Sequence, residues 1–304
     1  MEKIQSLCFY RTIMKHITLE MKNNRWIITS HGKMPLVEGR ISNQNIQWAN
    51  KQHGVFKNKR FNKNKGYITV EGHHTYLNHK SINTLEKLKH PDIIQLNFKN
   101  TLPILFEKDR YGISYNVEYI DNIKTTEISF MGMLHEKIDC IYQSCLNLNV
   151  DPLMLNPTYQ YFANILKKQL NFEEKKEYVL YVESSANLLT FVLIHNNNPI
   201  MKRSIEINDQ LEIETNNYFY YLKHYLMLPD IFIFFSKMDQ KMELFVIIVS
   251  GYYYNNSSQK IQELLRDLSC FREMDQEVMI EFQDCFIALG GVVIDESIKR
   301  KNQS

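Results

Sequence analysis

Three histidines, His73, His74 and His79, are the first residues with distinctive chemistry, because imidazole nitrogens are common ligands of transition metals. No cysteine or acidic residue has a matching spacing, and neighbouring residues of a strand point to opposite faces. We therefore interpret the three as surface histidines and predict no metal site.

A second combination, His135 with Cys140 or Cys145, has the residue types of a thiolate–imidazole pair. Helical spacing instead places Cys145 on an apolar stripe, where cysteine behaves as a small hydrophobe, so core packing is favoured. The absence of a paired CxxC spacing predicts reduced thiols and a reducing compartment. The five cysteines are Cys8, Cys140, Cys145, Cys270 and Cys285.

A basic stretch covers residues 51–65, with Phe56 and Phe61 among its lysines and asparagines. A solvated loop is the favoured interpretation, and contact with anionic lipid headgroups or binding of nucleic acid are the alternatives. Lys plus Arg number 36 and Asp plus Glu 34, so the overall charge predicts no polyanionic partner. The possible anionic-surface contacts are Lys57, Lys59, Arg60, Lys63 and Lys65.

Common catalytic motifs are missing from the sequence: GxxxxGK[ST], GxGxxG, HExxH and GxSxG do not occur, which disfavours an unrelated enzyme. No apolar run approaches the roughly 20 residues of a membrane helix, and no secretory signal opens the chain. With 44% apolar and 12% aromatic residues in 304, we expect a folded, soluble protein of the cytosol.

Hydrophobic periodicity predicts the elements that position these residues. Residues 16–21 and 25–30 form an opening hairpin, and residues 113–119 and 125–134 a second one. Residues 135–149 carry a helical apolar stripe, and a second helix follows with Asn156 as its cap and Pro157 in its first turn. That helix should bury Phe162, Ile165 and Leu166.

The second half of the chain is again rich in strands, predicted over residues 178–183, 188–195 and 199–207. A helix over residues 211–228 stops at Pro229. Short apolar runs at 232–235 and 244–249 have the length of buried strands, and a helix carrying Ile261, Leu264, Leu265 and Leu268 follows. Strands that alternate with helices on mixed sheets indicate the α/β class.

This order of elements resembles the actin-like (ribonuclease H-like) fold of the PilM family of type IV pilus assembly, and more loosely the cytoplasmic domain of GspL of type II secretion. Residues 135–152 resemble the helix that closes the inserted subdomain, and residues 159–166 the helix after it. Residues 179–207 are similar to the second phosphate hairpin. Further similarity lies in residues 31–41, 245–268 and 286–291.

The resemblance implies a two-lobed fold with mixed sheets and a small inserted subdomain. Residues 1–65 and 150–172 would form the first lobe, residues 66–149 the inserted subdomain and residues 173–304 the second lobe. An actin-like ATPase cradles phosphates in glycine-containing hairpin turns between its lobes, with carboxylates that hold magnesium.

The residues oppose phosphate binding at this place. The family pattern Asp-x-Gly falls on Tyr181 and Glu183 at its two ends, and the first hairpin at residues 9–12 has neither glycine nor acid. Tyr252, Tyr253 and Tyr254 should fill the cleft, with stacking on a base as the alternative. The degenerate nucleotide cleft would comprise Tyr181, Glu183, Ser184, Ser185, Ser250 and Gly251.

The resemblance therefore implies a non-catalytic scaffold of a pilus or secretion platform, cytoplasmic and peripheral at the inner membrane. It would bind the tail of a PilN-like bitopic protein near residues 113–150, together with other platform proteins and, as a further candidate, the assembly ATPase. No cofactor and no nucleic acid are expected.

Two alternatives stay open. The first is a nucleotide-gated ATPase that binds ATP and magnesium through Ser184, Ser185 and backbone amides, with Glu183 as the nearby carboxylate. The second is a nucleic-acid binder that uses residues 51–65.

Overall fold

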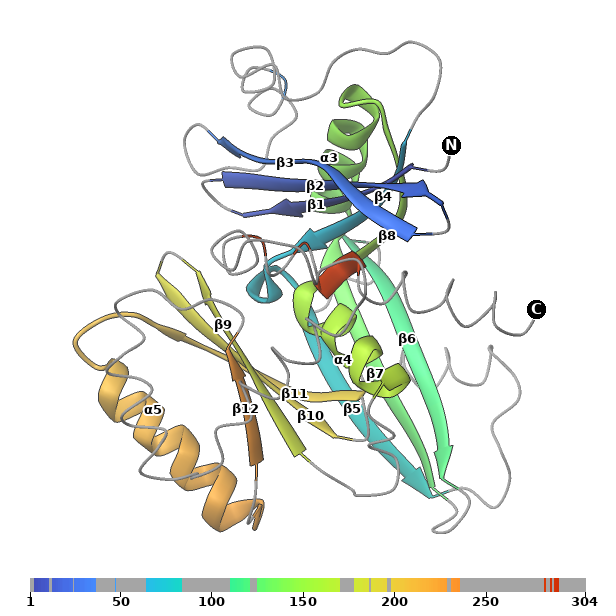
Figure 1. The fold of residues 1–304 in the computed structure, drawn as a ribbon. Helices are drawn as coiled ribbons and strands as arrows, with labels where there is room; N and C mark the ends of the chain where they lie inside the picture. Colours follow the sequence, from blue (N-terminus) through green and yellow to red (C-terminus); the bar gives the residue numbers. More distant parts are fainter. Residues whose placement is uncertain are drawn as a thin grey trace.

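Three β-sheets form the framework of the part of the chain described in a computed structural model (Figure 1). The described residues are 3–10, 13–23, 25–36, 47, 64–83, 110–120, 125–169, 178–185, 187–195, 198–228, 231–235, 282, 285 and 287–289. Among them, no helix is long and apolar enough to cross a membrane.

The first sheet has five strands in the order β3-β2-β1-β4-β8. β1 (Lys3–Phe9), β2 (Ile13–Lys22) and β3 (Arg25–Pro35) form an antiparallel meander, which confirms the opening hairpin. The chain turns after Phe9, where the Tyr10 amide donates to the Ile13 carbonyl. This bond and the antiparallel pairing of β1 with β2 confirm that the two strands form a hairpin.

Two parallel strands complete this sheet. β4 (Asn64–Val70) pairs with β1, and β8 (Val150–Pro157) pairs with β4. The predicted lobe boundary after residue 65 falls inside β4, so residues 66–70 belong to the first sheet rather than to an insertion. The division into two lobes otherwise stays a prediction.

The second sheet has the order β11-β10-β9-β12. β9 (Tyr178–Ser185), β10 (Leu188–His195) and β11 (Asn198–Glu206) are antiparallel neighbours, and β12 (Ile231–Phe235) runs parallel to β9. α5 (Leu211–Tyr220) continues into a π-helical turn (Tyr221–Tyr225). These elements confirm the strands predicted over residues 178–207 and 232–235, and the helix predicted over residues 211–228, which ends at Tyr225.

The third sheet consists of β5 (Tyr76–Asn83), β7 (Thr125–Leu134) and β6 (Tyr111–Ile120), in that order and antiparallel. It confirms the second predicted hairpin. α3 (His135–Asn147) begins directly after β7, and its buried face includes Ile141 and Cys145, as the apolar stripe predicts.

α4 (Thr158–Gln169) starts one residue later than a cap at Asn156 requires. The prediction of Asn156 as cap and Pro157 in the first turn is wrong, because both residues lie in β8, where Pro157 is the last residue and is paired with Val70. Proline is tolerated at a strand end, where one lost amide donor matters little. Phe162, Ile165 and Leu166 are fully buried, as predicted.

Strand alternation divides the core into three clusters. One face of the first sheet packs against α3 and one face of the second sheet packs against α5. The two remaining faces share a single central cluster with α4 (Figure 1). Cys285 and residues 287–289 also belong to this cluster, and the Cys285 sulfur lies 2.8 Å from that of Cys8 in β1.

Candidate functional site

The side chain of Glu183, in the second sheet, is hydrogen-bonded to the turn that follows β4 of the first sheet. Alternation in β9 puts Val179, Tyr181 and Glu183 on the face that meets α4, since Val179 and Tyr181 belong to the central cluster. The Glu183 carboxylate is 3% exposed and accepts a 2.7 Å hydrogen bond from the amide of Gly72. It also accepts a longer one, 3.5 Å, from the Thr158 hydroxyl.

Lys202 makes a second bond between the same two regions. Lys202 is in β11 and pairs with Val192 of β10, which in turn pairs with Tyr181 of β9, so Lys202 and Tyr181 lie on the same face of the sheet. Its ammonium donates to the carbonyl of Gly72 at 3.0 Å and to that of Thr75. Burial lowers the pKa of Lys202 to about 8, against the opposing charge of Glu183, so the group remains mostly protonated at neutral pH.

Both side chains are hydrogen-bonded to a 3-10 helical turn between β4 and β5, which consists of Gly72–His74 and is followed by Thr75. The Thr75 hydroxyl donates to the Gly72 carbonyl at 2.7 Å and lies 2.9 Å from the Tyr159 hydroxyl. Burial raises the pKa of Tyr159, which keeps its hydroxyl protonated. A Cβ at Gly72 would lie 2.9 Å from Glu183 Oε2 and 3.1 Å from Tyr159 Cδ1, so any larger residue would displace the Glu183 carboxylate and the Tyr159 ring.

The predicted cleft residues are placed as follows. Tyr181 is fully buried, with its ring centroid 5.2 Å from that of Phe162 in α4. Ser184 is buried on the opposite side of β9 from Glu183. Ser185 ends β9, and Ser250 and Gly251 lie outside the described residues, as do Tyr252, Tyr253 and Tyr254.

Among the predicted surface contacts, Lys65 is exposed on β4, whereas Lys57, Lys59, Arg60 and Lys63 lie outside the described residues. The predicted strand at 244–249 and the helix carrying Ile261, Leu264, Leu265 and Leu268 also lie outside the described residues. The segments 31–41 and 286–291 are described only at residues 31–36 and 287–289. Those predictions stay predictions.

Sequence reasoning missed Gly72, Thr75, Thr158 and Lys202. Glu183 and Gly72 are 111 positions apart, and no local pattern connects them. The available signal was Glu183, a charged residue directly after the apolar run of β9, because such residues are seldom buried without a partner. Lys202 gives no such signal, since β11 also contains Arg203 and Glu206.

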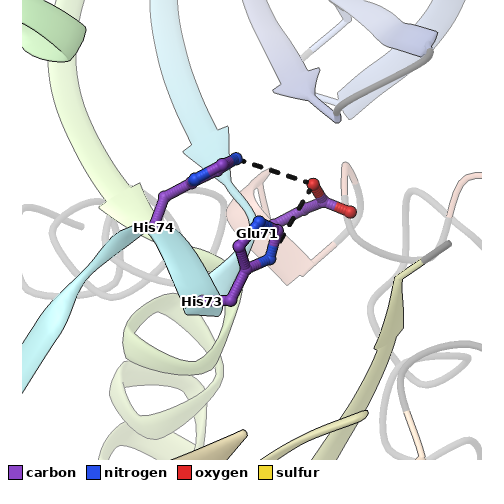
Figure 2. Close-up of side chains that lie close together, drawn as sticks. All are labelled: Glu71, His73 and His74. Atoms are coloured by element: carbon purple, nitrogen blue, oxygen red, sulfur yellow. Dashed lines mark ion pairs between the residues drawn. The ribbon is translucent and has the colours of Figure 1, made fainter. Parts of the chain in front are cut away.

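The interpretation of His73 and His74 as surface residues is wrong, because both side chains are mostly buried. Their side chains are 16% and 17% exposed, and their ring centroids are 3.8 Å apart. The two residues lie in the 3-10 turn, not in a strand, so they do not point to opposite faces. Glu71 supplies the acidic partner (Figure 2), with its Oε2 4.0 Å from His73 Nδ1 and 3.8 Å from His74 Nε2.

His79 is partly buried in β5, which also corrects its assignment to the surface. Its Nδ1 lies 3.0 Å from the Ser129 hydroxyl, and burial lowers its pKa. Cys145 is fully buried, and burial raises the pKa of its thiol to about 12. A thiolate–imidazole pair at Cys145 is therefore excluded at neutral pH.

An apolar groove lies beside this turn, between the third sheet, α3 and β8. It has a volume of about 280 Å³. Thr75 connects it to the turn, and β6, β7 and β8 provide most of its wall. The lining residues used below are Ile113 and Ser114 of β6, Met131 of β7, Ile138 of α3, and Leu155 and Asn156 of β8.

No protein-family model matches the sequence, and no curated protein matches it. Solved structures do match. The chain is similar to the PilM-PilN type IV pilus biogenesis complex over 96% of its length and 98% of that chain, with a TM-score of 0.61 at 10% identity. A Bacteroides thetaiotaomicron protein with an actin-like ATPase fold matches over 85% and 94%, with a TM-score of 0.52 at 9% identity.

These likenesses define the class: the chain has an actin-like fold, as its succession of elements predicts. Within that class its arrangement is PilM-like. The cytoplasmic domain of EpsL, an inner-membrane component of the type II secretion system of Vibrio cholerae, also matches, with a TM-score of 0.47 at 5% identity over 84% of this chain and 97% of that one.

Proposed function

We propose that this chain is a cytoplasmic scaffold of the inner-membrane assembly platform of a type IV pilus or a related secretion system. It binds the extended cytoplasmic tail of a PilN-like bitopic membrane protein and does not hydrolyse nucleotide. The observation that carries the proposal is the apolar groove beside the third sheet, on a chain that shares its arrangement with the PilM of a PilM-PilN complex.

The groove has the features that an extended peptide requires. Its floor is apolar, with Met131 and Ile138 on the sheet face that Ser114 shares, whereas Ser114 and Asn156 offer hydrogen bonds to a peptide backbone. β6 is an outer strand of the three-stranded sheet as described, so a peptide strand can add to it while its alternate side chains enter the groove.

The contact between the two sheets supports the lack of nucleotide chemistry. An actin-like ATPase needs a small residue in the second hairpin, where this chain has Glu183. The Glu183 carboxylate is bonded to the Gly72 amide and buried, so it would have to leave this contact to reach magnesium. A carboxylate in that position also repels phosphate.

The test uses a fluorescent peptide with the sequence of the cytoplasmic tail of the PilN-like protein encoded in the same genome. Fluorescence anisotropy with the full chain should give saturable binding, and Ile138→Asp should weaken it at least tenfold, because a carboxylate is then desolvated in the groove. Leu153→Asp is the matched control, since Leu153 lies on β8 but is 48% exposed and outside the groove lining.

Equal loss of binding in both variants, or no binding of the tail by the wild-type chain, would contradict the proposal. Thermal unfolding of each variant, measured in parallel, separates loss of the groove from loss of the fold.

Lys202 favours a second candidate, a nucleotide-gated scaffold. Its ammonium lies at the contact between the sheets next to Glu183, and if the sheets separate it becomes a cation for a phosphate. Calorimetry with ATP and ADP, with and without magnesium, distinguishes the two. Absence of heat supports the nucleotide-free scaffold, and micromolar magnesium-dependent binding that Lys202→Met abolishes supports gating.

A further inference from the structure

The turn between β4 and β5 brings three potential metal ligands together (Figure 2). Glu71 precedes the 3-10 turn with extended backbone angles, and His73 and His74 lie within the turn. One ligand atom of each residue lies within 4.8 Å of the other two. The shorter separations run from Glu71 Oε2, 3.8 Å to His74 Nε2 and 4.0 Å to His73 Nδ1.

We propose that Glu71, His73 and His74 bind a divalent transition-metal ion of the zinc type. Two imidazoles and one carboxylate are a known zinc donor set, with a fourth position left for water. A tetrahedral ion with bonds of about 2.0 Å needs ligand atoms about 3.3 Å apart, so small side-chain rotations suffice. Magnesium and calcium prefer all-oxygen sites and fit less well.

The two histidine rings lie close together, with centroids 3.8 Å apart, and one nitrogen of each faces the Glu71 carboxylate. Metal binding requires the unprotonated nitrogens. The Glu71 carboxylate is 2% exposed as a residue, so its negative charge is held inside the protein and is compensated well by a bound cation.

Lys137 of α3 supplies an outer contact, because its Nζ lies 2.7 Å from His74 Nδ1. A metal-bound histidine normally holds its second nitrogen in a hydrogen bond. Lys137 therefore holds the second nitrogen of His74 beside the proposed ion.

The same turn is bonded to the second sheet, which gives the ion a structural effect. Gly72 stands between two of the ligands, and its amide and carbonyl are bound by Glu183 and Lys202. An ion that fixes Glu71 and His73 therefore also fixes the backbone to which the second sheet is attached, and it should raise the unfolding temperature of the whole chain.

The experiment titrates the full chain, purified without a histidine tag and stripped with chelator, with cobalt(II) and then with zinc as competitor. We expect one equivalent of cobalt with the visible bands of a nitrogen- and oxygen-ligated tetrahedral ion. His73→Gln and Glu71→Gln should each lower the affinity about 10- to 100-fold. His79→Gln is the matched control, since His79 lies in β5 on Ser129, and its affinity should equal that of wild type.

Three results would overturn the proposal: no saturable cobalt binding to the wild-type chain, thiolate charge-transfer bands that assign the metal to cysteines, or equal affinities in wild type and His73→Gln. Melting in chelator identifies variants with a damaged fold. A wild-type measurement decides independently of them, because zinc should protect His73 and His74, but not His79, from carbethoxylation mapped by mass spectrometry.

Discussion

Replacing Glu183 with alanine should lower the free energy of unfolding by about 2 to 4 kcal/mol. A hydrogen bond to a charged group contributes about 1.5 to 3 kcal/mol, and the buried Gly72 amide that loses its acceptor adds a desolvation penalty of similar size that overlaps with it. Lys202 also loses the negative charge that opposes the lowering of its pKa. Glu183→Gln keeps an acceptor and should lose only about 1 to 2 kcal/mol.

Urea denaturation of the full chain measures this difference, and Glu206→Ala is the matched control. Glu206 is exposed at the end of β11 in the same sheet, so its removal should change the free energy by less than about 0.5 kcal/mol. Hydrogen exchange mapped by mass spectrometry adds a local readout, because residues 71–75 should exchange faster in Glu183→Ala. Equal stability of the two alanine variants, with unchanged exchange in that segment, would refute the contact.

Three further outcomes follow from the same region and from α3. Gly72→Ala should destabilise the chain by about 1 to 3 kcal/mol in urea, since its Cβ would meet Glu183 and Tyr159; a neutral effect would mean that the turn moves freely. Because the folded pKa of Lys202 is below the ordinary lysine pKa of 10.5, the folded state binds fewer protons between pH 8 and 10.5, and stability should rise with pH there. Lys202→Met should remove this rise, and an unchanged pH profile would contradict it. Cys145 should resist alkylation in the folded chain while Cys140, which is partly exposed, reacts, as mass spectrometry of the labelled peptides would reveal.

Hydrophobic periodicity predicted the strands and helices well where their burial depends on only one face of the element. The apolar run at 188–195 and the helical stripe that places Cys145 inside both reflect periodicity that the structure preserves. Pro157 misled the helix prediction because proline suits either a first helical turn or a strand end, and the pairing of Pro157 with Val70 selects the second.

The site was less accessible to such reasoning. Gly72 interrupts the strand pattern before His73, and a glycine there signals a turn, so the assumption of a continuing strand separated the histidines from Glu71. The bonds of Glu183 and Lys202 to Gly72 join segments more than a hundred residues apart, and only the packing of both sheets on α4 brings them together.

The central cluster has a consequence for how the chain comes apart. Ile17 of the first sheet, Ile165 of α4 and Val179 of the second sheet all belong to it. Neither sheet therefore has a complete hydrophobic core without the other. A polypeptide that ends before β9 would leave the inner face of α4 in water, and one that begins there would leave β9 and β10 without a cover. Proteolytic halves should therefore be insoluble singly and recover their shape only by reassociation, so the folding unit is the whole chain and not the lobe.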